Sequence, residues 1–482
     1  MQRLNRSSIC KTFFSGIMSV RLVDLRLLFP TMVVIGVNII MLKLPQIKFF
    51  QWHEYSSKES ESLWIQLIVT FSRFSIIITT FPFAVLNFAG LVTLCFFPTR
   101  HTKPKYSPLL APFICFRVVT RGLFPELVQQ NVEKNRETCL KSGLAKFMFE
   151  VVTDRPIYLL ENKFTLEQVV PPYYQTPNNS LFKARALHYC NEQEINQLGP
   201  NDWIVHLDEE TVLTEDSVIG ILNFVSSGDA DFGQGAITYA SGHMVNWVTT
   251  LIDGFRVGID YCYLRFSLNV LRRPIFSWKG SYMVARAGAE HDVSFDNGVE
   301  GSIAEDCFFG AVACSKGYRF GFIEGEMLEE STYTFADFIR QRKRWNKGIY
   351  LTARSPNIPI RHKIGILLMS FAALFLPFIT FGVVLNTSSN VPSLQITELI
   401  LRFVRVFYIY LFVFGNYNNL SRSRFHLVHR VCISILSILV IPVCAVLECI
   451  ASLCNTLTLN DIDFYIVQKS PKLCLKDSGA FV

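Results

Sequence analysis

The sequence has few charged residues and lacks the motifs that mark most nucleotide-binding enzymes. Asp, Glu, Lys and Arg make up 18% of its 482 residues, whereas 50% are hydrophobic and 42 are Phe. This composition argues against an ordinary soluble enzyme of several small domains. No GxxxxGK[ST] P-loop and no GxGxxG fingerprint occurs, so kinase and dehydrogenase interpretations lose their main support. Internal repeats and low-complexity tracts are absent as well.

Cysteine spacing also excludes a class of protein. The 13 cysteines include no CxxC pair, and several lie in apolar segments, where a thiol behaves as a small hydrophobic group. We therefore expect no disulfide framework.

Charge is missing altogether from three apolar runs that are long enough to cross a bilayer, Phe74–Pro98, Ile364–Asn386 and Val431–Leu447, the last near the lower limit. Two weaker candidates are Leu27–Leu42, which is short, and Ile400–Tyr417. Arg402 and Arg405 interrupt the latter, so it is either a span with snorkelling arginines or an interfacial helix. We expect about five such helices, two within residues 27–98 and about three transmembrane or re-entrant helices within 364–452.

Basic residues gather at the N-terminus, within residues 1–26, which favours a cytosolic N-terminus over a nucleic-acid partner as the source of the net charge of +7. A cleaved signal peptide is the alternative, but no small-residue cleavage site follows Leu42. Two crossings would then return the chain and leave residues 104–359 in the cytosol. The segment Asn386–Leu399 has no Lys or Arg, as expected of a loop on the far side.

The tail at residues 453–482 does not fit this topology. A fifth crossing would carry Lys469, Lys472 and Lys476 to the far side, against the charge bias. Either the last apolar segment is re-entrant or the tail violates the rule, and the sequence leaves both possibilities open.

Residues 104–359 change to short β-branched runs that alternate with helix-compatible segments, a pattern typical of an α/β domain on a mostly parallel sheet. The pattern predicts strands at Phe113–Thr120, Phe147–Thr153 and Trp203–Leu207, and helices at Pro125–Gly143 and Lys183–Cys190.

Two acidic sites directly follow predicted strands, where ligands bind in such folds: Asp154, and the triplet Asp208-Glu209-Glu210. Asp154 is equally compatible with an ordinary turn, and the triplet with an exposed acidic turn before a helix. We favour metal binding for the triplet, by Mg²⁺ or Mn²⁺ bridging two carboxylates and a diphosphate. Such an ion would neutralise charge on a departing nucleotide diphosphate.

Two further segments carry candidate chemistry. In Glu305-Asp306, a carboxylate in a partly apolar pocket could act as general base, although acids at a helix N-terminus are also common for structural reasons. Gln341-Arg342-Lys343-Arg344-Trp345 could hold a phosphate-bearing donor, or could lie as a basic helix on an anionic leaflet. We expect both, with Gln341, Arg344 and Trp345 on one helical face that points inward. The acids and this cluster together predict a glycosyltransferase.

Taken in order, the motifs resemble those of inverting, membrane-bound family 2 glycosyltransferases of the GT-A fold, the Rossmann-like nucleotide-diphospho-sugar transferase fold. The group contains the cellulose, chitin and hyaluronan synthases. The resemblance spans roughly residues 110–350 with the flanking apolar segments, and it rests on Asp154, Lys183-Ala184-Arg185-Ala186, Asp208-Glu209-Glu210, Glu305-Asp306 and Gln341–Trp345. Closer similarity, to egghead-type β-1,4-mannosyltransferases, rests on Arg117–Gly122, Trp203–Thr211 and Ser277–Tyr282.

This resemblance implies transfer of mannose from GDP-mannose to glucosylceramide, in glycosphingolipid synthesis at the ER or Golgi membrane. The roles that it implies are Asp154 at the nucleotide base, Lys183 and Asp208 at the donor, Asp208 and Glu210 at the metal, Asp306 at the acceptor hydroxyl, and Gln341, Arg344 and Trp345 at the diphosphate and acceptor. Glu210 stands where the third position of the family's DxD motif is usually Asp, which leaves the metal preference open.

Other functions remain compatible with these residues. A processive polysaccharide synthase, or another lipid glycosyltransferase that uses a UDP-sugar, would carry the same Gln-x-x-Arg-Trp signature. A non-enzymatic membrane scaffold is disfavoured, because every acidic position of the motif set is occupied.

Overall fold

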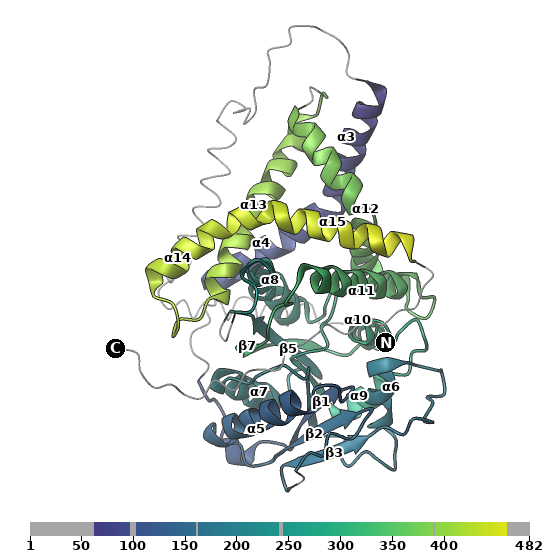
Figure 1. The fold of residues 1–482 in the computed structure, drawn as a ribbon, viewed down its shortest axis with the longest axis vertical. Helices are drawn as coiled ribbons and strands as arrows, with labels where there is room; N and C mark the ends of the chain where they lie inside the picture. Colours follow the sequence, from purple (N-terminus) through teal and green to yellow (C-terminus); the bar gives the residue numbers. More distant parts are fainter. Residues whose placement is uncertain (1–61, 97–102, 161, 241–243, 389–390, 460–482) are drawn as a thin grey trace, which may run out of the picture.

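The computed structural model describes residues 62–96, 103–160, 162–240, 244–388 and 391–459. The expected N-terminus at 1–26, the expected crossing Leu27–Leu42 and most of the tail at 453–482 lie outside these residues. In Figure 1 a lower layer built on a β-sheet lies beneath an upper layer of long helices.

A seven-stranded sheet forms the centre of the lower layer, in the order β3-β2-β1-β4-β6-β5-β7. Strand β6 is antiparallel to both of its neighbours and the other pairings are parallel, which confirms the prediction of a mostly parallel sheet. The strands are β1 (Ile114–Thr120), β2 (Phe147–Thr153), β3 (Thr165–Val169), β4 (Trp203–Leu207), β5 (Phe232–Thr238), β6 (Met283–Arg286) and β7 (Phe320–Leu328).

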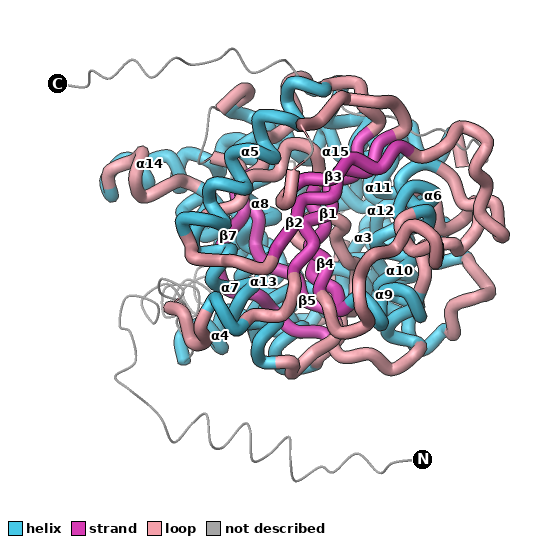
Figure 2. The backbone as a smooth tube through the Cα atoms, turned by 90° about the horizontal axis from the view of Figure 1, so that it is seen from below, coloured by secondary structure: helices cyan, strands magenta, loops and turns pink. Residues whose placement is uncertain are grey.

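Helices cover both faces of this sheet, which explains why its central strands are buried along their length instead of alternating between buried and exposed residues. All five residues of β4 are buried, and so are all seven of β5. Figure 2 shows helices of the domain on both sides of the strands. They are α5 (Pro125–Lys141) and α7 (Glu215–Ser227), opposite α6 (Phe182–Tyr189), α9 (Ala287–Val293) and α10 (Glu305–Ser315).

The predicted strands and helices before residue 210 are confirmed, each to within one or two residues of β1, α5, β2, α6 and β4. The later strands were not predicted, and β5 shows why. It contains Gly233 and Gly235, and glycine is depleted in strands. Gly235 is needed here because a Cβ at this position would lie 2.2 Å from the ring of Tyr282.

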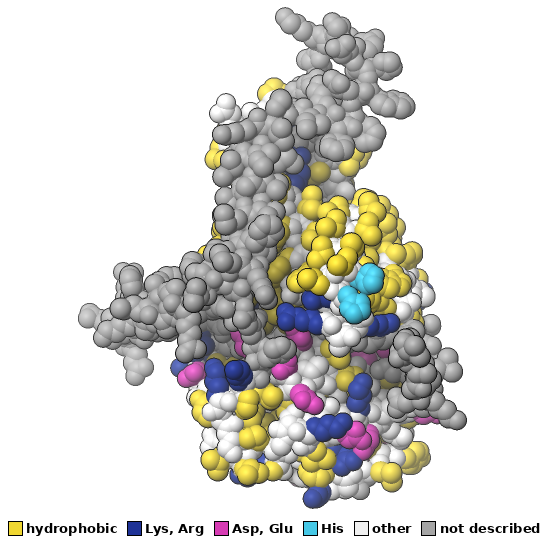
Figure 3. Space-filling model, turned by 90° about the vertical axis from the view of Figure 1, so that its left-hand side faces the viewer, with side chains coloured by type: hydrophobic (Ala, Val, Ile, Leu, Met, Phe, Trp, Pro, Cys, Tyr) yellow, Lys and Arg dark blue, Asp and Glu magenta, His cyan; other side chains and the backbone are white. Residues whose placement is uncertain are grey.

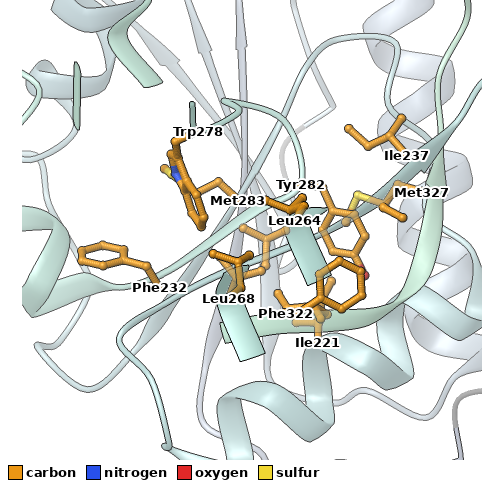
Figure 4. Packing of buried hydrophobic residues seen from close by; sticks show 14 of the residues in the cluster. Ile221, Phe232, Ile237, Leu264, Leu268, Trp278, Tyr282, Met283, Phe322 and Met327 are labelled. Carbon is orange, nitrogen blue, oxygen red and sulfur yellow. The ribbon is translucent and has the colours of Figure 1, made fainter. Parts of the chain in front are cut away.

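The hydrophobic core extends from the sheet into the segments beside it. In Figure 4, side chains from α7, β5, β6 and β7 pack against Leu264 and Leu268. These two leucines belong to the short π-helical segments η3 (Asp260–Leu264) and η4 (Ser267–Leu271), which follow helix α8 (Trp247–Ile259).

The upper layer contains the apolar helices. They are α3 (Leu63–Ser75), π-helix η1 (Ile76–Thr80), α4 (Phe81–Phe96), α12 (Ile360–Ser388), α13 (Gln395–Asn419), α14 (Leu427–Leu436), 3-10 helix η5 (Ser437–Val440) and α15 (Ile441–Leu457). Within the described residues, three stretches are long and apolar enough to cross a membrane: Leu63–Leu94, Ile360–Asn386 and Leu427–Leu457. Helix α13, which contains Arg402 and Arg405, is not among them. Figure 3 shows hydrophobic side chains above a zone of Lys and Arg. Because three of its stretches are long and apolar enough to cross a bilayer, the protein is a membrane protein.

Close packing of α13 against α8 joins the two layers. A Cβ on Gly415 would lie 2.0 Å from the carbonyl oxygen of Gly254, so a larger residue at 415 would force the two helices apart. At the end of α13, Asn419 accepts a hydrogen bond from the backbone N–H of Tyr239 (2.6 Å) and donates one to the carbonyl of Thr250 (3.2 Å). The end of α13 is thereby attached to the sheet domain.

A buried guanidinium links three of the strands to helix α9. Arg117 on β1 pairs with Glu150 on β2 (2.6 Å) and with Glu290 on α9 (3.0 Å), and Glu290 also contacts His206 on β4 (2.6 Å). Burial by itself raises the pKa of Glu290, but His206 and Arg117 outweigh it and hold that pKa below its usual value. The network depends on the cation because two carboxylates share it.

We predict that Arg117→Met destabilises the protein by about 3–5 kcal/mol, since breaking a buried ion pair leaves uncompensated charge. Arg121→Met is the matched control, because that side chain is 51% exposed. Thermal unfolding in detergent measures both variants, and equal losses of stability would contradict this account of the network.

Candidate active site

The carboxyl ends of β1, β2 and β4 meet at one edge of the sheet. Thr120 pairs with Thr153 and Val118 pairs with Leu207, so Asp154 and Asp208 both follow strands that end there. This placement agrees with the strand-end expectation.

The acidic triplet forms a tight turn directly after β4. The backbone N–H of Asp208 donates to Oγ1 of Thr211 (3.2 Å), and the backbone N–H of Thr211 donates to the carbonyl of Asp208 (3.0 Å). Inside this turn, Glu209 is buried and accepts a hydrogen bond from Thr120 Oγ1 (2.5 Å). Glu209 thus supports the turn from the core, whereas Asp208 and Glu210 are partly exposed.

Lys183, at the start of α6, pairs with the first residue of the triplet. Its Nζ lies 2.6 Å from Oδ1 of Asp208 and 3.8 Å from Oε1 of Glu305. Burial lowers the pKa of Lys183, but Asp208 and Glu305 outweigh it, so the pKa is raised overall. The ammonium therefore stays charged at neutral pH.

Glu305 and Asp306 open helix α10 beside this ammonium. The absence of a side chain at Gly280 leaves room for both groups: a Cβ there would lie 3.3 Å from Oδ2 of Asp306 and 3.4 Å from Nζ of Lys183. Burial, and then the charge of Asp306, raise the pKa of Glu305 to about 7. Burial also raises the pKa of Asp306. Both carboxyls are more basic than in water, as a general base at neutral pH needs to be.

Helix α11 (Phe335–Arg354) completes the site from the membrane side. It approaches α10 closely, since a Cβ on Gly348 would lie 2.2 Å from Cβ of Ala304. The positive charge of Arg344 lowers the pKa values of both Glu305 and Asp306, although burial outweighs it. Four of the predicted residues thus come together: Lys183, Asp208, Asp306 and Arg344.

Trp345 lies between two guanidinium groups. The ring centroid is 4.4 Å from Cζ of Arg256 and 4.2 Å from Cζ of Arg342. Gln341 accepts a hydrogen bond from Nη1 of Arg342 (3.0 Å). Two of the residues expected at the diphosphate and acceptor, Gln341 and Trp345, therefore contact Arg342.

Arg342 was part of the predicted motif but was not singled out, and its partners were not foreseen. It is buried and pairs with Asp253 on α8 (2.6 Å) and Glu448 on α15 (3.0 Å). A sequence signal did exist for Glu448, because a lone acid inside a long apolar run calls for a partner.

Asp154 lies apart from the central group. It pairs with Arg185 (2.7 Å) and, at 3.9 Å, with Arg121. Arg185 follows Lys183 by two residues on α6, so this one short helix contacts both strand-end acids.

Sequence reasoning missed a buried polar cluster behind the triplet. Glu329, after the end of β7, accepts hydrogen bonds from Ser281 Oγ (2.5 Å) and Thr211 Oγ1 (2.8 Å). Burial, and then the charges of Asp208 and Glu210, raise the pKa of Glu329 to about 7. It was not found because β7 was not predicted.

The donor set suits a hard divalent ion that keeps other ligands. Among the described residues, no group of three or more His, Cys, Asp or Glu side chains forms a metal site. Asp208 and Glu210 offer carboxylate oxygens, and Mg²⁺ in particular is typically held by one or two carboxylates together with substrate phosphates and water. These residues therefore fit a metal that binds together with a diphosphate.

We predict that Glu210→Gln weakens Mn²⁺ binding in the presence of GDP by about tenfold or more, because a charged oxygen ligand is lost. Glu209→Gln is the matched control, since its amide oxygen still accepts from Thr120 and it does not face the site. Electron paramagnetic resonance of Mn²⁺ measures both. Equal affinities in the two variants would remove Glu210 from the metal site.

Comparison with known proteins supports the interpretation of these motifs. The family model "Glycosyl transferase family group 2" matches residues 203–447. The β-1,4-mannosyltransferase egh of Drosophila melanogaster is 44% identical over 88% of this chain and 90% of its own length. The β-1,4-mannosyltransferase bre-3 of Caenorhabditis elegans is 45% identical over 80% of this chain and 85% of its own.

Among solved structures, the mannosyltransferase PcManGT from Pyrobaculum calidifontis, in complex with GDP-Man and Mn²⁺, covers 82% of this chain and 100% of its own. Its sequence identity is 11% and its TM-score 0.47. The family match and the relatives at more than 40% identity decide the assignment. The chain belongs to glycosyltransferase family 2, as an egghead-type enzyme with a GT-A catalytic domain between apolar helices.

Proposed function

We propose that this enzyme is a β-1,4-mannosyltransferase that transfers mannose from GDP-mannose to glucosylceramide with inversion at the anomeric carbon. The names of the egh and bre-3 relatives support the sugar and the linkage. The observation that carries the chemistry is the cluster of Lys183, Asp208, Asp306 and Arg344, in which two cations and two carboxylates from separate elements converge.

The cations of this cluster would bind the diphosphate of the donor. Lys183 is held against Asp208, and Arg344 approaches the start of α10 from the opposite layer. Asp208 and Glu210 would hold a Mg²⁺ or Mn²⁺ ion, which when bound neutralises charge on the leaving diphosphate. Asp154, which pairs with Arg185 on the same helix as Lys183, is proposed to contact the nucleotide base. Gln341 and Trp345, braced by Arg342, would bound the site toward the membrane and the acceptor.

Asp306 would act as the general base. Its carboxylate accepts the proton of the acceptor's 4-hydroxyl while that oxygen bonds to the anomeric carbon of mannose. The bond from that carbon to the phosphate oxygen breaks on the opposite face, and GDP leaves with the electron pair. One displacement converts an α-linked donor into a β-linked product, so no covalent intermediate on the protein is needed.

We further propose that the catalytic domain faces the cytosol at the ER or Golgi membrane. The basic N-terminus and the Asn386–Leu399 segment, which lacks Lys and Arg, support this orientation. Helix α11 carries Arg340, Arg342, Lys343 and Arg344 directly below the apolar layer, close to where a lipid acceptor would enter.

The test of the proposed function is a donor screen in membranes that contain the full-length chain. We expect GDP-mannose, but not UDP-sugars, to transfer one sugar to glucosylceramide, and NMR of the product should show a β-1,4 linkage. A UDP-sugar preference, or a growing polymer on the primer, would refute the assignment.

We predict that Asp306→Asn lowers kcat by about 10²–10⁴, the usual contribution of general-base catalysis, while GDP-mannose affinity changes little. The substitution keeps the shape of the side chain and removes its basicity. Transfer rate and donor binding should be measured in parallel. A loss confined to affinity would place the base elsewhere.

The raised pKa values predict an acid limb in the rate profile. Because the base must be deprotonated, kcat/KM should fall at acid pH, and the fall should begin above the ordinary range of an aspartate, since burial raises the pKa of Asp306. Burial, and then the charge of Asp306, also raise the pKa of the neighbouring Glu305, to about 7. The charge of Arg344 lowers both pKa values, so Arg344→Gln should move the limb to higher pH, besides lowering the rate. An acid limb at the same pH in Arg344→Gln as in the unchanged enzyme would contradict the electrostatic effect of Arg344 on these two carboxyls.

A further inference from the structure

The C-terminal helical stretch, α14–η5–α15, has the composition of a membrane span but a different placement. Its 31 residues from Leu427 to Leu457 are apolar enough to cross a bilayer. As a helix they would measure about 46 Å, more than the roughly 30 Å of a hydrocarbon core. Figure 1 shows this stretch lying across α12 and α13, directly above α11, instead of running alongside them.

The first end of this stretch is attached to the catalytic layer. Arg430 on α14 donates to the carbonyl of Tyr417 (2.5 Å) and stacks on its ring, with Cζ 4.2 Å from the centroid. Tyr417 lies in the last turn of α13, where Asn419 bonds to Tyr239 and Thr250 of the catalytic domain.

The C-terminal end of this stretch, after α15, also contacts the catalytic layer. Lys347 on α11 is buried, and its Nζ donates to the carbonyl of Thr458 (2.9 Å) and to that of Leu459. These carbonyls directly follow α15, so a cation of the catalytic domain caps this helix. A helix that crosses a bilayer has its ends on opposite sides. In this stretch, the C-terminal end contacts the domain that carries the active site, and the N-terminal end contacts the part of α13 that is bonded to that domain.

The middle of the stretch is held in the same way. Glu448 pairs with Arg342 of α11 (3.0 Å), and Ser452 Oγ donates to the carbonyl of Ala373 on α12 (2.5 Å). If the stretch stood upright in the membrane, these contacts and both end contacts would break, and a carboxylate would enter the hydrocarbon, which is costly.

The opposite face of the stretch is an apolar stripe. Exposed side chains recur every three to seven residues on the surface turned away from the protein: Val428, Val431, Ile435, Leu439, Val446, Ile450, Leu453 and Leu457. The inward face carries Arg430, Ser434, Ser437, Glu448, Ser452 and Asn455. Helix α12, which packs against α15, also exposes apolar residues, such as Phe378, Phe381 and Val384, so lipid that surrounds α12 can continue onto the stripe.

We propose that α14–η5–α15 lies in the plane of the membrane, with its apolar stripe in the acyl chains of the leaflet nearest the catalytic domain, and that it does not cross. The partner of this surface is a lipid leaflet. The proposal also resolves the charge conflict of the tail, because Lys469, Lys472 and Lys476 then follow on the catalytic side. It stands independently of the sugar that is transferred.

The first experiment compares sidedness within the full-length chain. An epitope that contains an N-glycosylation acceptor is appended after Val482, and in a second protein is inserted at Gly317, an exposed turn of the catalytic domain. In sealed microsomes the two tags should behave alike, both open to protease and both unglycosylated. Opposite behaviour of the two tags would overturn the proposal. If both tags were glycosylated, the in-plane helix would stand and the cytosolic orientation proposed above would fall.

The second experiment measures depth. Single spin-labelled cysteines replace Val431, Val446 and Leu457 in an otherwise cysteine-free chain, reconstituted in phosphatidylcholine vesicles. Accessibility to oxygen and to a soluble nickel complex should give one shallow depth at all three positions. A deep middle position between two shallow ends would show a spanning or re-entrant helix and would overturn the proposal.

Discussion

The buried guanidinium of Arg342 is the interaction on which the arrangement of the two layers depends. It pairs with Asp253 on α8 and Glu448 on α15 and stacks on Trp345, and so ties three helices to one cation. A cation buried with one partner would be expensive, but here two carboxylates and an aromatic face compensate it. Because α11 is held in this position, Gly348 meets Ala304 and Arg344 reaches the acids at the start of α10.

Within the site, the topology of the sheet brings acidic residues together, and cations from neighbouring helices balance their charge. Parallel strands collect acids at their carboxyl edge, and these acids would repel one another without cations between them. Lys183 from one face of the sheet and Arg344 from the membrane side supply that charge. The site is therefore assembled around charge before any ligand is bound, which is the form of preorganisation that charge-transferring reactions exploit.

The extent to which the site could be predicted varies with how local its determinants are. Asp208 follows the five residues of β4, four of which are apolar, so its position at a strand end was readable from the chain. The different direction of Glu209, which bonds to Thr120 of the neighbouring strand, was not readable, because it depends on a pairing between segments 89 residues apart. Glu329 was missed for a related reason, since β7 joins the sheet beside the glycine-containing β5.

The sequence by itself determined the class of the protein: apolar runs without charge, strands that are largely apolar because both faces are covered, and acids at their ends. These are properties of composition and short-range periodicity, which act before distant segments meet. Only the tertiary structure decided which side chains share the site and where the last apolar helix lies. Hydropathy counts apolar residues but does not report partners, and the partners of Glu448 and of the carbonyls after α15 are Arg342 and Lys347, more than 100 residues earlier. Their pairing, and not the apolar content of the helix, sets its direction.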